Sequence, residues 1–266
     1  MEYFEFIIYG LIQGLTEFIP VSSTAHLKVL SLFLGIDDPG HSLSAIIQLG
    51  SVLAIFWYFK NDIFYLRKQN SSKFFEYLLS KSLLKSILIG TIPIIIFGGT
   101  IKIFVPHFYN HTLRSDLSIA ITSLLMAIFM YIADSTKRGS VDLKNHKYSD
   151  SFLIGISQAF AIFPGVSRSG ITISTALLSG WGRGDAAKFS FLLGIPAISF
   201  AAIVEFISSF NELKTLSFFP LIVGLATTFV SSLFAIDFLL KFFSSKGLKL
   251  FVIYRLIFSF LILLNL

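Results

Sequence analysis

Six apolar stretches, each about as long as a lipid bilayer is thick, constrain this chain more than any other feature of its sequence. Crossing the hydrocarbon core takes about 20 mostly apolar residues. The stretches lie at residues 43–60, 84–105, 116–134, 187–208, 217–240 and 248–266. Only 14% of the residues are charged and the mean hydropathy is +0.80. Because 266 residues cannot bury that much apolar surface in one soluble core, the sequence predicts an all-α polytopic membrane protein with about six transmembrane helices.

Two further apolar segments, residues 4–35 and 151–180, are interrupted in the middle by polar residues. The interruptions read Pro20-Val21-Ser22-Ser23-Thr24-Ala25-His26 and Pro164-Gly165-Val166-Ser167-Arg168-Ser169-Gly170. Inside a bilayer, non-helical backbone is tolerated only where protein covers it or water reaches it. A charge at that depth marks function by default. We therefore expect two re-entrant helix-loop-helix hairpins, each entering and leaving the membrane on one side.

The basic residues of the loops agree with this arrangement. If both broken segments are hairpins, the loops at 60–85, 134–150, 181–188 and 241–249 lie on one side and hold fifteen of the 21 lysines and arginines. Short cytoplasmic loops carry such an excess. The pattern predicts both termini outside, with the first hairpin entering from the outside and the second from the inside, so that their tips meet within the membrane.

The two broken segments also resemble each other. Residues 10–13 and 155–158 share the pattern Gly-x-x-Gln, and residues 21–24 and 166–169 align at the same offset of 145. Such internal similarity is typical of inverted repeats with broken helices. We interpret the chain as a single membrane domain, 1–266, with inverted repeats at approximately 1–134 and 150–266. Chance similarity between apolar segments is the alternative.

The residue types at the breaks favour a phosphate-bearing ligand. Arg168 offers a planar fork of donors that matches phosphate oxygens. Glycines let backbone N–H groups approach an anion, and helix N-termini favour it. Hydroxyl donors come from Ser22, Ser23, Thr24, Ser167, Ser169 and Thr172. Each hydroxyl taken alone could equally bond only to backbone or to neighbouring helices.

Acidic and titratable side chains accompany these donors. Gln13 and Glu17 are four residues apart and share one helical face. A carboxylate beside a phosphate site repels the ligand unless a cation intervenes, which favours an oxygen-ligated Mg²⁺ or Ca²⁺. His26 is a candidate proton-transfer group or nucleophile, or a structural histidine. The deeper Arg255 could serve as a structural partner, but this interpretation is given little weight. The other four histidines are interpreted as solvated.

The residues at both breaks resemble the signatures of the undecaprenyl-diphosphate phosphatases, also called bacitracin-resistance proteins. The first motif runs from Gln13 through Glu17 to Pro20-Val21-Ser22-Ser23-Thr24-Ala25-His26, and the second from Pro164 to Thr172. The resemblance extends over the full length. It differs at Gln13, where many members carry Glu, and at Ala25, where Gly is common. The neutral Gln13 is a weaker metal ligand, so either the metal affinity is lower or the single carboxylate of Glu17 carries both roles.

The resemblance implies hydrolysis of undecaprenyl diphosphate to undecaprenyl phosphate and inorganic phosphate. This reaction recycles the carrier lipid for cell-wall synthesis and confers bacitracin tolerance. By position, Glu17, Ser23, His26 and Arg168 are implied to be catalytic, with Gln13 and Glu17 holding a divalent cation. The implied phosphate-binding residues are Ser22, Thr24, Ser167, Ser169 and Thr172. Either Ser23 or His26 could be the nucleophile.

The expected partners and location follow from the same reading. The substrate is a polyprenyl diphosphate lipid, no nucleic acid partner is expected, and a homodimer is possible. The protein is expected in the bacterial inner membrane, with its site opening to the outer, periplasmic face. A transporter or flippase of polyprenyl phosphate is the alternative function, since broken helices in inverted repeats also suit transport. A non-catalytic lipid-binding scaffold is the other.

Overall fold

The computed structural model describes residues 3–34, 40–60, 81–105, 107–136, 139–214 and 217–265. These ranges are helical apart from turns, and their only β contact is an isolated bridge between Val141 and Trp181. The elements are α1 (Tyr3–Phe18), α2 (Ser23–Leu34), α3 (Gly40–Tyr58), α6 (Lys81–Phe104), the π-helix η2 (Phe108–Leu113), α7 (Asp116–Ser135), α8 (Tyr148–Ala159), the 3₁₀ turn η3 (Phe160–Ile162), α9 (Arg168–Leu178), α10 (Arg183–Ser208), α11 (Phe210–Leu213), α12 (Phe218–Lys246) and α13 (Lys249–Leu264). The expectation of an all-α polytopic membrane protein is confirmed.

Four helices within the described ranges are long and apolar enough to cross a membrane. They contain Leu83–Ile101, Asp116–Ser135, Arg183–Ser208 and Phe218–Lys246. The other two predicted spans are helical but shorter. The apolar part of α3, Leu43–Tyr58, and the whole of α13 have 16 residues each, or about 24 Å at 1.5 Å per residue.

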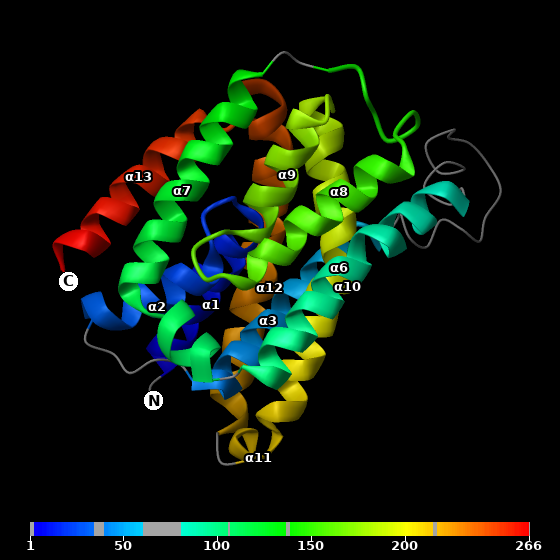
Figure 1. The fold of residues 1–266 in the computed structure, drawn as a ribbon. Helices are drawn as coiled ribbons and strands as arrows, with labels where there is room; N and C mark the ends of the chain where they lie inside the picture. Colours follow the sequence, from blue (N-terminus) through cyan, green and yellow to red (C-terminus); the bar gives the residue numbers. More distant parts are fainter. Residues whose placement is uncertain are drawn as a thin grey trace.

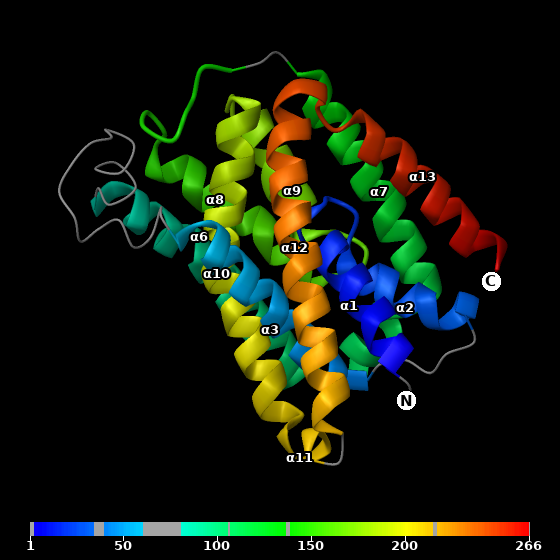
Figure 2. The same ribbon diagram turned by 180° about the vertical axis from the view of Figure 1, so that it is seen from behind.

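Both predicted breaks are real interruptions. The chain leaves α1 after Phe18 and resumes as α2 at Ser23, and it leaves η3 after Ile162 and resumes as α9 at Arg168. Figures 1 and 2 show the two tips near the middle of the molecule. The α1–α2 hairpin reaches its tip from the end of the molecule where α11 lies, whereas the α8–α9 hairpin comes from the opposite end.

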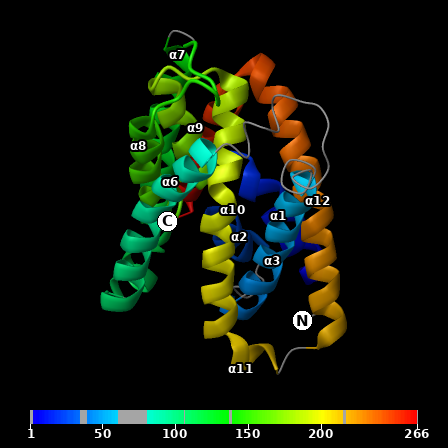
Figure 3. The same ribbon diagram turned by 90° about the vertical axis from the view of Figure 1, so that its right-hand side faces the viewer.

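The two halves of the chain interlock. Helix α1 packs along α12, and α8 packs along α6, so that each hairpin is covered by a helix of the other half (Figure 3). Glycines permit both contacts. A Cβ on Gly10 would lie 2.7 Å from the carbonyl oxygen of Gly224, and one on Gly155 would lie 2.6 Å from the Cα of Gly90. The limits of the predicted repeats stay a prediction.

Contacts at one end of the molecule bring together the loops predicted to share a side. Asp134, at the end of α7, forms an ion pair with Arg183 at the start of α10. The same carboxylate accepts the backbone N–H of Leu248, between α12 and α13, at 3.0 Å. His146 bonds Ser86, on α6, at 2.7 Å. These contacts support the grouping of the loops at 134–150, 181–188 and 241–249, whereas residues 61–80, most of the 60–85 loop, lie outside the described residues. The side of the membrane that the loops face stays a prediction.

Candidate active site

The first break is held open by a strained serine. Ser22 has a φ of +78°, a conformation that costs a non-glycine residue about 1–3 kcal/mol and persists only with support from its surroundings. That support is present. The carbonyl of Ser22 accepts hydrogen bonds from the backbone N–H of His26 at 3.2 Å and from His26 Nδ1 at 2.7 Å.

The second break also contains a serine with a positive φ. Ser167 has a φ of +70°, and Ser22 and Ser167 are 145 residues apart, the offset of the sequence similarity. The hydroxyl of Ser167 caps α9 by accepting the N–H of Gly170 at 3.2 Å. Gly165, with a φ of +98°, lets the chain turn beside α7, where a Cβ would lie 2.8 Å from the carbonyl oxygen of Ile119. The matching strain supports a common structural origin of the two breaks.

The two tips touch, as the sequence predicted. The backbone N–H of Gly165 donates to Ser22 Oγ at 3.2 Å. Arg168 Nη2 lies 3.4 Å from Glu17 Oε1, and their side chains are only 9% and 11% exposed. An ion pair this buried has little water to screen it. Residues 151 positions apart therefore form one polar centre.

Glu17 contacts all three of the other side chains in that centre. Its Oε2 accepts the hydroxyl of Ser23 at 2.7 Å and the amide of Gln13 at 3.1 Å, while its Oε1 faces Arg168. A hydroxyl donating to a carboxylate at this distance is the arrangement of a nucleophile beside its proton acceptor. The structure thus brings together Gln13, Glu17, Ser23 and Arg168, four of the residues predicted from sequence.

Arg168 is fixed by α10 as well as by Glu17. Its Nη1 donates to the carbonyl of Ser190 at 3.4 Å. Gly194, one turn further along α10, leaves the space that the guanidinium occupies, since a Cβ there would collide with it. The Nε atom of Arg168 is buried without a hydrogen-bond partner in the described part of the chain. A buried donor left without a partner is costly, so an anion bound here would satisfy it.

The residues predicted to bind phosphate lie at or near this centre, but in different surroundings. Ser169 and Thr172 are fully buried, whereas Thr24 is exposed. The hydroxyl of Thr172 donates to the carbonyl of Arg168 at 2.8 Å and bonds the hydroxyl of Ser190 at 2.6 Å. Ser167 and Ser169 share a hydrogen bond of 3.3 Å. Their binding of phosphate stays a prediction.

His26 lies one turn along α2 from Ser22 and Ser23 and faces α13. Its Nε2 lies 2.6 Å from the hydroxyl of Tyr254. Its ring stacks on Phe258 with centroids 4.3 Å apart. Both ring nitrogens are therefore engaged, neither of them with Ser23 or Glu17.

Arg255 joins the two breaks, a role that sequence reasoning missed. It is fully buried and donates to the carbonyl of Pro20 at 3.2 Å, to the carbonyl of Gly165, and to the carbonyl of Ser123 at 3.4 Å. One guanidinium thus hydrogen-bonds to both tips and to α7 and fixes their relative positions. The only signal in the sequence is an arginine deep in an apolar stretch, which by default marks function.

The expectation for the other histidines is wrong for His146. This residue is not simply solvated: it bonds Ser86, and its ring lies 5.2 Å from the Trp181 ring. Partial burial lowers the pKa of His146 from its usual value. His107 is exposed, as expected, and the side chains of His41 and His111 lie outside the described residues.

The oxygen ligands around Glu17 suit a divalent cation that takes its remaining ligands from the substrate and from water. No group of three or more His, Cys, Asp or Glu side chains that could hold a metal occurs among the described residues. The centre instead offers one carboxylate, the Ser23 hydroxyl and the side-chain amide of Gln13, which turns its nitrogen toward Glu17 and would have to rotate to present its oxygen to a cation. Mg²⁺ is commonly held by one or two carboxylates plus water and substrate phosphates. The residues present suit that mode of binding.

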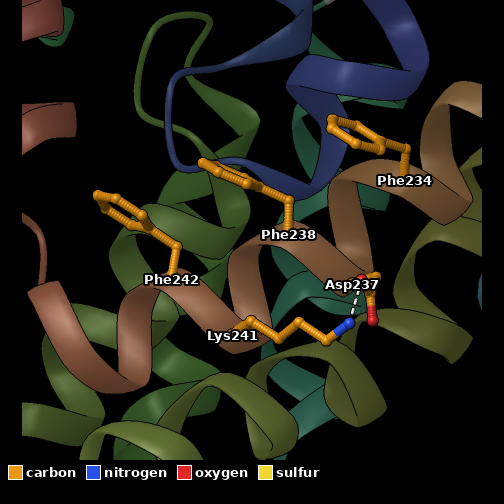
Figure 4. A pocket seen from close by; sticks show the side chains of 5 residues that line it. All are labelled: Phe234, Asp237, Phe238, Lys241 and Phe242. Carbon is orange, nitrogen blue, oxygen red and sulfur yellow. Dashed lines mark hydrogen bonds and ion pairs between the residues drawn. The ribbon is translucent and has the colours of Figure 1, made fainter.

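A shallow pocket of about 360 Å³ lies on α12 (Figure 4). Three phenylalanine rings, Phe234, Phe238 and Phe242, follow one another along the helix above the Asp237–Lys241 ion pair. None of the residues predicted for the site lines it. This pocket is separate from the polar centre at the breaks.

Known proteins match this chain over almost its full length. Residues 6–261 match the family model described as "Bacitracin resistance protein BacA". A relative from Prochlorococcus marinus strain AS9601, named "Undecaprenyl-diphosphatase", is 75% identical over 266 residues, covering 100% of this chain and 97% of the relative. Two proteins of the same name come from other strains of that organism. The one from strain MIT 9312 is 74% identical and covers 100% of this chain and 99% of its own length. The one from strain MIT 9313 is 44% identical and covers 97% of this chain and 87% of its own length.

Proposed function

The chain belongs to the family of the bacitracin resistance protein BacA, and on that premise we propose how it carries out the reaction for which its curated relatives are named. It is an integral membrane enzyme that hydrolyses undecaprenyl diphosphate to undecaprenyl phosphate and inorganic phosphate. The reaction recycles the carrier lipid and confers bacitracin tolerance. The observation that carries the assignment of residues is the buried contact between Glu17 on the first hairpin and Arg168 on the second.

In the first step, Ser23 Oγ attacks the terminal phosphorus of the diphosphate. Its proton passes to Glu17 Oε2, which lies 2.7 Å away. The bond from that phosphorus to the bridging oxygen breaks, and undecaprenyl phosphate leaves with the electron pair. The terminal phosphoryl group is now carried by Ser23. The geometry favours Ser23 over His26 as the nucleophile, because Ser23 is bonded to its proton acceptor whereas both ring nitrogens of His26 are already bonded to the Ser22 carbonyl and to Tyr254.

In the second step, water displaces Ser23 from phosphorus and inorganic phosphate is released. Ser23 Oγ recovers its proton from Glu17, and the proton lost by the water is taken up by His26. Arg168 stabilises the charge that spreads over the phosphoryl oxygens in both steps, as a planar fork of donors can. A cation held by Glu17 and Gln13 supplies further neutralisation of the diphosphate when it is bound.

The site is proposed to open to the outer face of the cell membrane. Loop charge supports this, since the end of the molecule that carries Asp134, Arg183 and Leu248 also carries the basic loops expected in the cytoplasm. The first hairpin, with Glu17 and Ser23, reaches its tip from the opposite end (Figure 1). The lipid tail of the substrate then stays in the bilayer while its head group meets both tips.

Phosphate release by the purified protein in detergent tests the proposal. We expect release from both C15 and C55 prenyl diphosphates, and Glu17→Gln and Arg168→Ala each to lower turnover by about 100-fold or more, because they remove the proton acceptor and the charge stabiliser. Asp237→Asn is the matched control for Glu17→Gln, since Asp237 is an exposed acid paired with Lys241. Its turnover should equal that of the parent.

Detergent also separates hydrolysis from transport, because no leaflets exist there. A parent protein that moves labelled lipid phosphate across liposomes but releases no phosphate in detergent would establish the flippase alternative. Near-parent turnover in Glu17→Gln would refute the role given to that carboxylate.

A further inference from the structure

The hydrogen bonds of His26 determine which of its nitrogens carries a proton. The carbonyl oxygen of Ser22, 2.7 Å from Nδ1, can only accept. Nδ1 therefore bears the hydrogen, and Nε2 of the neutral ring bears a lone pair. The Tyr254 hydroxyl, 2.6 Å from Nε2, must then be the donor in that bond. Tyr254 thus contacts the only basic nitrogen of His26.

Stacking fixes the ring in this orientation. Phe258 lies parallel to the His26 ring, at 4° and 4.3 Å between centroids, and the Tyr254 ring is within 10° of parallel at 5.6 Å. Both aromatic residues come from α13, four residues apart and hence on one face of the helix. The imidazole cannot rotate Nε2 toward another partner without breaking these contacts.

Tyr254 is suited to both protonation states of His26. A phenolic hydroxyl can donate to the lone pair of a neutral ring and, after turning about its C–O bond, accept from the N–H of an imidazolium. The charged pair gives the stronger of the two bonds. Tyr254 is 43% exposed, so its hydroxyl has room to turn. A phenylalanine would keep the stacked ring but offer neither bond.

We propose that Tyr254 relays a proton to His26 during the hydrolysis. Its O–H proton passes to Nε2 while the phenol oxygen takes up the proton lost by the attacking water, and the phenol then accepts the Nε2–H bond of the imidazolium. The inference rests on the proposed function, in which His26 takes up the proton lost by the attacking water. It adds to the site a residue of the last helix that neighbours Arg255 and lies 228 positions from His26 in the chain.

Tyr254→Phe tests this in two backgrounds. In the parent we expect kcat for phosphate release to fall about 10- to 100-fold, the effect of losing one hydrogen bond to a charged group, while KM changes less than about twofold. In the His26→Gln background, the same change should lower kcat no further, because its route of action is gone. The unfolding temperature should stay that of the parent.

Tyr131→Phe is the matched control, since Tyr131 is an exposed tyrosine of α7 outside the site; its kcat should equal that of the parent. Parent-like kcat in Tyr254→Phe would overturn the inference, and so would an equal fold loss in both backgrounds, which would mean that Tyr254 acts independently of His26. A parent protein that releases no phosphate would instead sink the proposed function, and full turnover in His26→Gln would sink both.

Discussion

At the scale of single residues, the centre holds more positive than negative charge. Arg168 and Arg255 are both buried, but the only carboxylate bonded to either in the described residues is Glu17. A buried charge that no opposite charge balances is strongly unfavourable. A diphosphate head group supplies the missing negative charge, so the same electrostatic arrangement that destabilises the empty centre favours its substrate. Arg255 contributes through position and charge without contacting Glu17.

The proposed role of the neutral Gln13 as a metal ligand leads to a prediction about the metal dependence of this centre. EDTA is expected to abolish phosphate release, and Gln13→Glu is expected to lower the Mg²⁺ concentration for half-maximal activity by about tenfold, because a second carboxylate beside Glu17 raises the charge available to the cation. Titration of activity with Mg²⁺ after chelation measures this. Gln158→Glu is the control: Gln158 is the buried counterpart of Gln13 in the second hairpin, and its half-maximal Mg²⁺ concentration should match the parent's. Full activity in EDTA would contradict the cation proposal.

Most of the residues in the centre could be predicted from the sequence, because the two polar runs are unusual in apolar segments. Arg255 and Tyr254 could not. The partners of Arg255 are backbone carbonyls that the fold brings from positions 235 and 90 residues away, and a backbone carbonyl leaves no mark in a sequence. Tyr254 lies among aromatic residues of an apolar helix, where a tyrosine at the edge of a membrane helix is ordinary.

At the scale of elements, the hairpins depend on two serines in left-handed backbone conformations. Ser22 and Ser167 occupy the residue just before a helix begins, where serine is favoured as a cap. Their positive φ is better suited to glycine. The sequence predicts the breaks but not this strain, because serine gives no sign of a left-handed conformation.

Two substitutions of Ser167 distinguish the effect of helix capping on stability from the effect of backbone strain. Ser167→Ala should lower stability by about 1 kcal/mol or more, since it removes the hydroxyl that accepts Gly170 N–H and keeps the strained φ. Ser167→Gly should cost less than Ser167→Ala, because glycine relieves the strain and is itself a tolerated cap. Unfolding temperatures in one detergent compare the two. Equal destabilisation would show that backbone strain at this position has no measurable cost.

At the scale of the whole molecule, the loop charges predict the orientation in the membrane. The chain has no cysteine, so single cysteines report sidedness without a background. A cysteine at Asn145, in the exposed α7–α8 loop, should react with a membrane-impermeant thiol reagent only after cells are opened, whereas one at Ser217, before α12, should react in intact cells. The reverse pattern would place the site opening toward the cytoplasm and contradict the proposed outer face.

The interlocking of the two halves has a consequence for how the protein is made. Helix α1 is synthesised first, yet the helix that packs along it, α12, begins only at Phe218. Arg255, which bonds both breaks, emerges later still. During translation, the polar tip of the N-terminal hairpin therefore lacks its contacts with α12 and Arg255 until those residues have been synthesised. We therefore expect newly made chains to gain hydrolytic activity only once α13 has left the ribosome, and chains that end before α13 to be degraded as incomplete.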